Sequence, residues 1–136
     1  MITEYKRGDE FMSPQPILAY ITPQMIGVRI IDCAMKLANM LGRELIVVTV
    51  LPGKADAATR SDDVKCLKMI SDICGVDITV RYSDRAAESL ISQITESCPS
   101  HIFVGEGCSL LPKNKAIFPH VPISVVTNKT VFTVPA

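Results

Sequence analysis

The chain has 136 residues, of which 48% are hydrophobic, a composition typical of one globular domain and unlike that of a disordered segment. Its 14 Lys and Arg residues equal its 14 Asp and Glu residues, so a net charge of zero at pH 7 predicts no attraction to nucleic acid. No apolar run is long enough to span a bilayer, and the polar stretch 1–15 lacks the apolar centre of a signal peptide. We therefore expect a cytoplasmic protein that binds neither nucleic acid nor membrane.

The five cysteines agree with a reducing compartment, because their number is odd and no two have the C-x-x-C spacing. The fifth of them in chain order, Cys108, lies in a glycine turn, whereas we interpret the other four as small apolar core residues: Cys33, Cys66, Cys74 and Cys98. The two histidines, His101 and His120, add no paired ligand spacing. The sequence therefore predicts no metal site.

Apolar strands alternate with amphipathic helices along the first part of the chain. Residues 1–15 are polar and predict a flexible arm, which leaves 16–136 for the globular domain. The nearly continuous apolar run 16–21 is typical of a strand covered on both faces, as in a parallel sheet, and 44–51 is a second run of this kind. The alternating stretch 77–82 predicts a more exposed, outer strand.

Three helices are expected between these strands. Thr22 and Pro23 predict the cap and the first position of the first helix. Ser61 predicts the cap of the second helix, and either Ser83 or Asp84 predicts that of the third. Apolar spacing assigns Val64, Leu67, Ile70 and Cys74 to the inner face of the second helix, and Ala87, Leu90, Ile91, Ile94 and Cys98 to that of the third.

The C-terminal part of the chain reads differently. The stretch 101–105 predicts a short buried strand, and two prolines before residue 122 leave no room for a regular fourth helix. Another strand is expected over 122–127. The tetrapeptide 127–130 could then turn the chain so that 131–134 pairs antiparallel with it, or the tail could reach a second subunit.

The order of these elements predicts an α/β fold. We expect a single doubly wound, mainly parallel sheet of five strands in the order 3-2-1-4-5, with a possible antiparallel strand at the C-terminal end. Ligands of such sheets bind beyond the carboxyl ends of the strands, at the point where the strand order reverses. That point lies between the first and fourth strands, and the candidate residues for a crevice there are Thr22, Pro23, Val50, Gly105, Gly107, Cys108 and Ser109.

The stretch VGEGCSLLPKNK leaves two interpretations open. Gly105 and Gly107 let backbone amides approach an anion, and Ser109 could add a hydroxyl. The alternative is a turn that only ends a strand, since G-x-G alone is a weak indication of a phosphate loop. Glu106 would repel a phosphate unless its side chain points away. Because the Walker A sequence and the G-x-S-x-G motif are both absent, no catalytic residue is assigned.

Four segments together resemble a universal stress protein domain, of the kind also found in bacterial potassium-sensor kinases. They are ILAYITP, KLANMLGRELIVVTVL, SDRAAESLISQITESCPSHIFVGEG and HVPISVV. The resemblance spans roughly residues 16–127. It implies a Rossmann-like fold of the adenine-nucleotide alpha-hydrolase kind, a homodimer and, in one branch of the family, binding of ATP or AMP.

This chain departs from the motif of the nucleotide-binding branch, which is G-x-x-G, nine residues, then Gly followed by Ser or Thr. Gly105 matches the first glycine, but Cys108 stands at the second, and no glycine follows Gly107. Thr22 stands near the place of an expected aspartate. The helix start that supplies the second phosphate contact in the family is also expected to be missing. The resemblance therefore implies a chain without tight ATP binding and without a required cofactor.

We expect a non-enzymatic, dimeric signalling or stress-response module, with a further protein partner left open. One alternative is an adenine-nucleotide-binding, weakly hydrolysing stress protein that uses the turn from Gly105 to Ser109. Another is a thiol-based sensor through Cys108, whose pKa the amide dipoles of the turn would lower. The expected dimer surface comprises Ile123 and Val125 of the penultimate strand with Val131, Phe132 and Val134 of the C-terminal segment.

Overall fold

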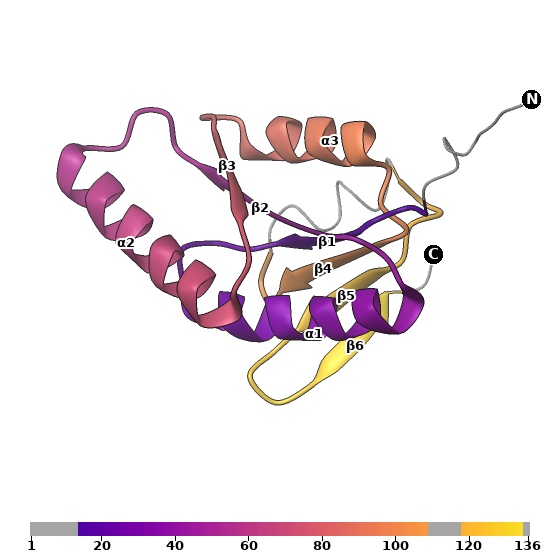
Figure 1. Ribbon diagram of the computed structural model, residues 1–136. Helices are drawn as coiled ribbons and strands as arrows, with labels where there is room; N and C mark the ends of the chain where they lie inside the picture. Colours follow the sequence, from indigo (N-terminus) through magenta and orange to yellow (C-terminus); the bar gives the residue numbers. More distant parts are fainter. Residues whose placement is uncertain (1–13, 109–117, 135–136) are drawn as a thin grey trace, which may run out of the picture.

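The computed structural model describes residues 14–108 and 118–134 (Figure 1). The strands and helices in this part of the chain are β1 (Ile17–Tyr20), α1 (Ile26–Leu41), β2 (Leu45–Leu51), α2 (Ala57–Cys74), β3 (Ile78–Tyr82), α3 (Ala86–Ser97), β4 (His101–Gly105), β5 (Ile123–Val126) and β6 (Val131–Val134). Ser109 and nearly all of the predicted N-terminal arm lie outside the described residues.

The strands form one sheet in the order β3-β2-β1-β4-β5-β6. The first five are parallel, and Ile17 of β1 pairs with Leu45 on one side and with His101 on the other. β6 runs antiparallel to β5 within the same chain, with Val126 opposite Val131. The predicted order 3-2-1-4-5 is confirmed, and the C-terminal segment is a hairpin strand in this structure.

Two apolar cores lie on opposite faces of this sheet, because side chains alternate along each strand. Ile17 and Ala19 of β1 point toward the core shared with α1 and α2, whereas Leu18 and Tyr20 point toward the core shared with α3. Figure 1 shows α3 on one side of the sheet and α1 on the other. The apolar run of β1 is therefore buried on both faces, as its composition predicts.

The start of α1 differs from the prediction. The helix begins at Ile26 after Met25, and no side chain caps it. Before it, the chain makes a tight turn in which the Gln24 amide donates to the Thr22 carbonyl and the Gly27 amide donates to the Gln24 carbonyl. The assignment of Thr22 and Pro23 to the helix start is therefore wrong, because a turn of backbone hydrogen bonds precedes the helix.

The second helix starts one turn earlier than predicted. Asp56 is its N-cap, and the Asp56 Oδ1 atom accepts a hydrogen bond of 2.8 Å from the Thr59 amide. The prediction that Ser61 caps this helix is therefore wrong. Aspartate and serine are equally good N-cap residues, so the sequence offered two suitable caps and the structure uses Asp56. Val64 is also no inner-face residue, since it is 44% exposed and lines an open groove with Tyr82 of β3.

Neither predicted cap of α3 caps that helix. The Ser83 Oγ atom accepts from the Arg85 amide, and the Asp84 Oδ1 atom accepts from the Gly53 amide across the neighbouring loop, each at 3.0 Å. Arg85 occupies the N-cap position without a side-chain hydrogen bond. At the other end, Cys98 has a φ of 48° and is exposed, so its assignment to the core is wrong. It occupies the left-handed position that ends the helix.

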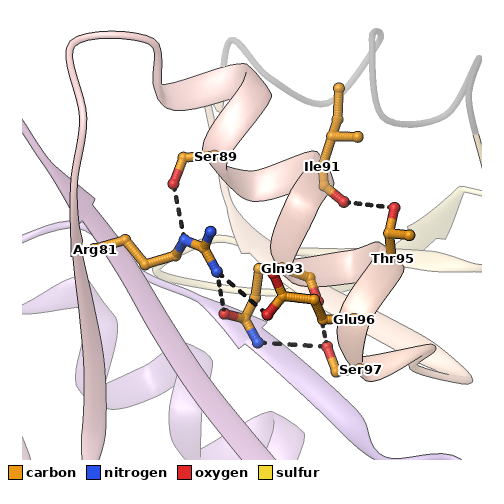
Figure 2. A network of polar contacts seen from close by, with 7 residues as sticks. All are labelled: Arg81, Ser89, Ile91, Gln93, Thr95, Glu96 and Ser97. Atoms are coloured by element: carbon orange, nitrogen blue, oxygen red, sulfur yellow. Dashed lines mark hydrogen bonds and ion pairs between the residues drawn. The ribbon is translucent and has the colours of Figure 1, made fainter.

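A polar network fastens the edge strand β3 to α3 (Figure 2). The Arg81 guanidinium donates from Nε to Ser89 Oγ at 2.9 Å and from Nη1 to Gln93 Oε1 at 3.0 Å. It also lies 3.7 Å from the Glu96 carboxylate. The Arg81 side chain is 28% exposed, so these contacts form in a partly desolvated place. They fix the outer strand that the sequence predicts.

Candidate functional site

A cavity of about 350 Å³ opens at the carboxyl ends of β1 and β4, where the strand order reverses. We call it the crevice. Its lining residues are Tyr20, Thr22, Gln24, Ile26, Ile30, Gly105, Glu106, Gly107 and Cys108. Topology alone predicts a site in this place, since the loops after these two strands diverge there.

The predicted site residues divide into three groups. Four of them line the crevice: Thr22, Gly105, Gly107 and Cys108. Pro23 follows Thr22 and is half-buried beside the crevice without lining it, and Val50 is a core residue on the α3 face of the sheet. Ser109 lies outside the described residues.

Five lining residues were not among the predicted site residues, namely Tyr20, Gln24, Ile26, Ile30 and Glu106, and Tyr20 is the most buried polar one. It ends β1 and is 7% exposed. The pKa of the Tyr20 phenol is raised, mainly because the group is buried and to a smaller extent because Cys108 lies nearby. The phenol therefore stays protonated at neutral pH. The Tyr20 side chain packs in the core on the α3 face and borders the crevice. The signal in the sequence was a single polar tip at the carboxyl end of the otherwise apolar run ILAYI.

The glycine turn at the crevice is held by hydrogen bonds within the chain. The Glu106 amide donates to the Val126 carbonyl at 3.1 Å, and the Cys108 amide donates to the Gly105 carbonyl at 3.3 Å. Gly107 has a φ of 79°, which a side chain would disfavour. Gly105 also allows close packing, because a Cβ there would lie 3.2 Å from the Ile30 Cδ1 atom of α1, which is a tight contact. Both glycines therefore have structural reasons that involve no ligand.

The charge of the crevice is unfavourable for a phosphate. Among its described lining residues, Glu106 carries the only charge, and it is negative. The nearby Arg29 is held elsewhere, since its Nε atom donates to the Thr127 carbonyl. Two of the amides that could hold an anion are used within the chain. The residues that the structure describes here do not fit a nucleoside triphosphate.

Cys108 lies half-buried in this turn and packs against the core on the α3 side. None of the five cysteines, all of which lie in the described ranges, forms a disulfide bond. His101 begins β4, so it lies at the end of this strand that is away from the crevice. Its pKa is lowered, mainly because the ring is partly buried and to a smaller extent because of the positive charge of Arg43. His120 is exposed and does not line the crevice.

The residues of the expected dimer surface lie on β5 and β6. Ile123 is 1% exposed and Val125 is 4% exposed, and both side chains belong to the core on the α3 face. β6 covers the edge of β5, so the outer strand is β6, where Val131 is 39% exposed. The side chains of Phe132 and Val134 lie outside the described residues.

In the described ranges 14–108 and 118–134, no group of three His, Cys, Asp or Glu side chains is placed to hold a metal ion. No helix in that part of the chain is long and apolar enough to cross a membrane.

Comparison with known proteins places the fold. No family model and no curated protein matches the sequence. A solved chain from Pseudomonas aeruginosa UCBPP-PA14 that is assigned to the universal stress proteins matches 85% of this chain at 13% identity, with a TM-score of 0.64. This chain spans 48% of that protein's length.

Two shorter solved chains match over nearly their whole length. The universal stress protein from Archaeoglobus fulgidus matches 87% of this chain and 96% of its own, at 16% identity and a TM-score of 0.58. A universal stress protein in complex with cAMP matches 85% of this chain and 97% of its own, at 15% identity and a TM-score of 0.54. The resemblance read from the sequence is thus confirmed for the fold, which is that of universal stress proteins.

Proposed function

We propose that this chain is a non-catalytic signalling or stress-response module of the universal stress protein kind, acts as a homodimer in the cytoplasm and does not bind ATP tightly. The crevice carries this proposal. It stands where the fold offers a ligand site, but its one described charge is the Glu106 carboxylate. A triphosphate would face this carboxylate with no described cation to offset its own charge.

The amides of the turn strengthen the argument against tight ATP binding. Those of Glu106 and Cys108 already donate to carbonyls of the chain, so a phosphate could use them only after the turn had opened. A hydrogen bond to a charged group contributes about 1.5–3 kcal/mol. Two missing bonds of this kind weaken binding by roughly two to four powers of ten.

The proposed dimer forms through the outer edge of β6, which pairs with no other strand in the described ranges 14–108 and 118–134. This strand has no charged residue between Val131 and Val134. An uncharged edge strand presents unpaired backbone groups, and an antiparallel copy of itself can satisfy them about a twofold axis. The zero net charge of the chain at pH 7 adds no general repulsion between two copies.

A thermal-shift titration with ATP tests the proposed loss of binding. Ligand at about 100 times its Kd stabilises a fold by about 2.7 kcal/mol, so ATP at about 1 mM would clearly raise the melting temperature if its Kd were about 10 μM. We expect no such rise. A rise already at micromolar ATP would overturn the proposal, and magnesium without nucleotide serves as the control.

The dimer is tested separately by sedimentation over a range of concentrations. We expect the sedimentation coefficient to fall from a dimer value to a monomer value on dilution. A monomer that persists at high micromolar concentration would overturn this part of the proposal.

Adenine-nucleotide binding with weak hydrolysis is the second candidate function, because a solved universal stress protein of this fold is a complex with cAMP. AMP and cAMP carry fewer charges than ATP and would meet less repulsion from Glu106. The same titration with these two nucleotides distinguishes the candidates: stabilisation by either one at micromolar concentration would favour nucleotide binding.

A further inference from the structure

Tyr20 places a phenol at the wall of the crevice. The residue is 7% exposed, packs in the core on the α3 face and lines the cavity, so its phenol is held in a fixed place at the crevice wall. A phenol at this position can donate a hydrogen bond to, or accept one from, a ligand that enters the crevice.

The other lining residues define which ligand would be accepted. Thr22 and Gln24 offer a hydroxyl and an amide, both uncharged, and Ile26 and Ile30 of α1 supply an apolar wall. Glu106 is exposed at the turn and carries the negative charge. The lining thus combines one carboxylate, neutral hydrogen-bonding groups and an apolar surface.

We propose that the crevice binds a small organic cation, with a protonated amine opposite Glu106, a hydrogen-bonding group on the Tyr20 hydroxyl and an apolar body against Ile26 and Ile30. The volume of about 350 Å³ is near the lower end of the 300–1,000 Å³ typical of small-molecule sites, which suits one ring or a short chain. The inference goes beyond the proposed function, because it names the chemical class of a signal that the module could receive.

Three probes of nearly equal shape and different charge test this inference. They are tyramine, its uncharged isostere para-propylphenol, and the anion para-hydroxyphenylpropionate. Each is titrated into the full chain while amide NMR signals are followed at Gln24, Gly105 and Gly107. We expect tyramine to bind most tightly and the anion least, with shifts concentrated at these amides.

Two outcomes of the titration would overturn the inference. One is an anion that binds as tightly as tyramine, since this would show that Glu106 does not select charge. The other is the absence of shifts at the crevice amides with any probe at millimolar concentration. Neither outcome bears on the proposed loss of ATP binding, which the thermal-shift titration decides by itself.

A charge variant locates the selectivity. Glu106→Gln should lower the ratio of tyramine affinity to para-propylphenol affinity about two- to fivefold, the range for an exposed charge pair. Glu44→Gln is the matched control, since Glu44 is also exposed but precedes β2 at the amino ends of the strands. An unchanged ratio in Glu106→Gln would contradict the proposed place of the amine.

A hydroxyl variant tests the second contact. Tyr20→Phe keeps the ring and should weaken all three probes about two- to tenfold, because each loses one neutral hydrogen bond. Tyr82→Phe, at an exposed position on β3, is the control and should leave the affinities unchanged. Equal affinities in Tyr20→Phe and the unmodified chain would remove the phenol from the site.

Discussion

The two edges of the sheet differ in how they meet solvent. β3 carries the charged residue Arg81, which hydrogen bonds fasten to α3, and parallel pairing joins the strand to β2 (Figure 2). β6 carries no charge and is held to β5 by an antiparallel hairpin. A charged residue and a covering element are common protections of an edge strand against pairing with another chain. The β3 edge thus has a protection that the β6 edge lacks, which is why we place the subunit contact at β6.

The largest expected effect concerns the anchoring of β3. Arg81→Ala should lower the free energy of unfolding by about 2 kcal/mol, because it removes hydrogen bonds to Ser89 and Gln93 in a partly desolvated place. Urea unfolding measures this loss. Arg85→Ala is the control, since Arg85 forms an exposed ion pair with Glu88 and should lose about 0.5 kcal/mol or less. Equal losses would mean that the network holds β3 no better than a surface ion pair.

The next effect tests which edge associates. Val131→Lys places like charges near the twofold axis of the proposed dimer and should weaken association at least about tenfold. Val80→Lys is the matched control on the other edge, where Val80 is 36% exposed. Sedimentation of the two variants compares the edges directly. If Val80→Lys dissociated the dimer and Val131→Lys did not, the assignment of the two edges would have to be exchanged.

A smaller effect concerns the hydroxyl of Thr49 in β2, beside the β3 edge. Its Oγ1 atom is buried and has no hydrogen-bond partner in the part of the chain that the structure describes. Thr49→Val removes this unpaired group at nearly constant shape and should raise the free energy of unfolding by about 1 kcal/mol. Denaturant midpoints measure the change.

Ser124 on β5 provides the contrast to Thr49. Its Oγ atom lies 2.8 Å from the Thr133 Oγ1 atom of β6, so this buried hydroxyl is paired. Ser124→Ala should therefore lower the free energy of unfolding by about 1 kcal/mol. A gain in stability from both variants would contradict the view that pairing decides the sign.

The smallest effect depends on pH and concerns the cap of α2. Hydrogen bonds from Thr59 hold the pKa of Asp56 below its usual value of 3.8. Because the folded pKa is lower than the unfolded one, the carboxylate stabilises the fold above pH 3.8, and this contribution is lost as the pH falls through the folded pKa. Asp56→Ala should lower the melting temperature at neutral pH, and the difference should shrink in acid. Asp56→Asn should retain most of the cap at neutral pH.

The fold could be predicted because the central strands are buried on both faces and are therefore continuous apolar runs in the sequence. The place of the crevice followed from strand order alone. The helix starts could not be predicted, because each loop offers several capping residues and distant contacts choose between them. Asp84 is an example: it accepts from the Gly53 amide of another loop instead of capping α3.

The contents of the crevice were harder to predict than its place. Tyr20 was hidden inside an apolar run, where an aromatic residue reads as part of the strand. Gly105 gave the opposite difficulty, since a glycine that admits a ligand and one that admits the Ile30 side chain look alike in sequence. Only the packing of α1 against β4 distinguishes them.

The central position of β1 has a consequence for the order of assembly during synthesis. Its Ile17 pairs with Leu45 soon after β2 emerges, whereas its other neighbour, His101, follows only after two more helices. Pairing across such a separation forms late because a long loop must close first. The crevice lies along this late seam between β1 and β4. A nascent chain that ends after β3 therefore has one wall of the crevice and cannot yet hold a ligand there.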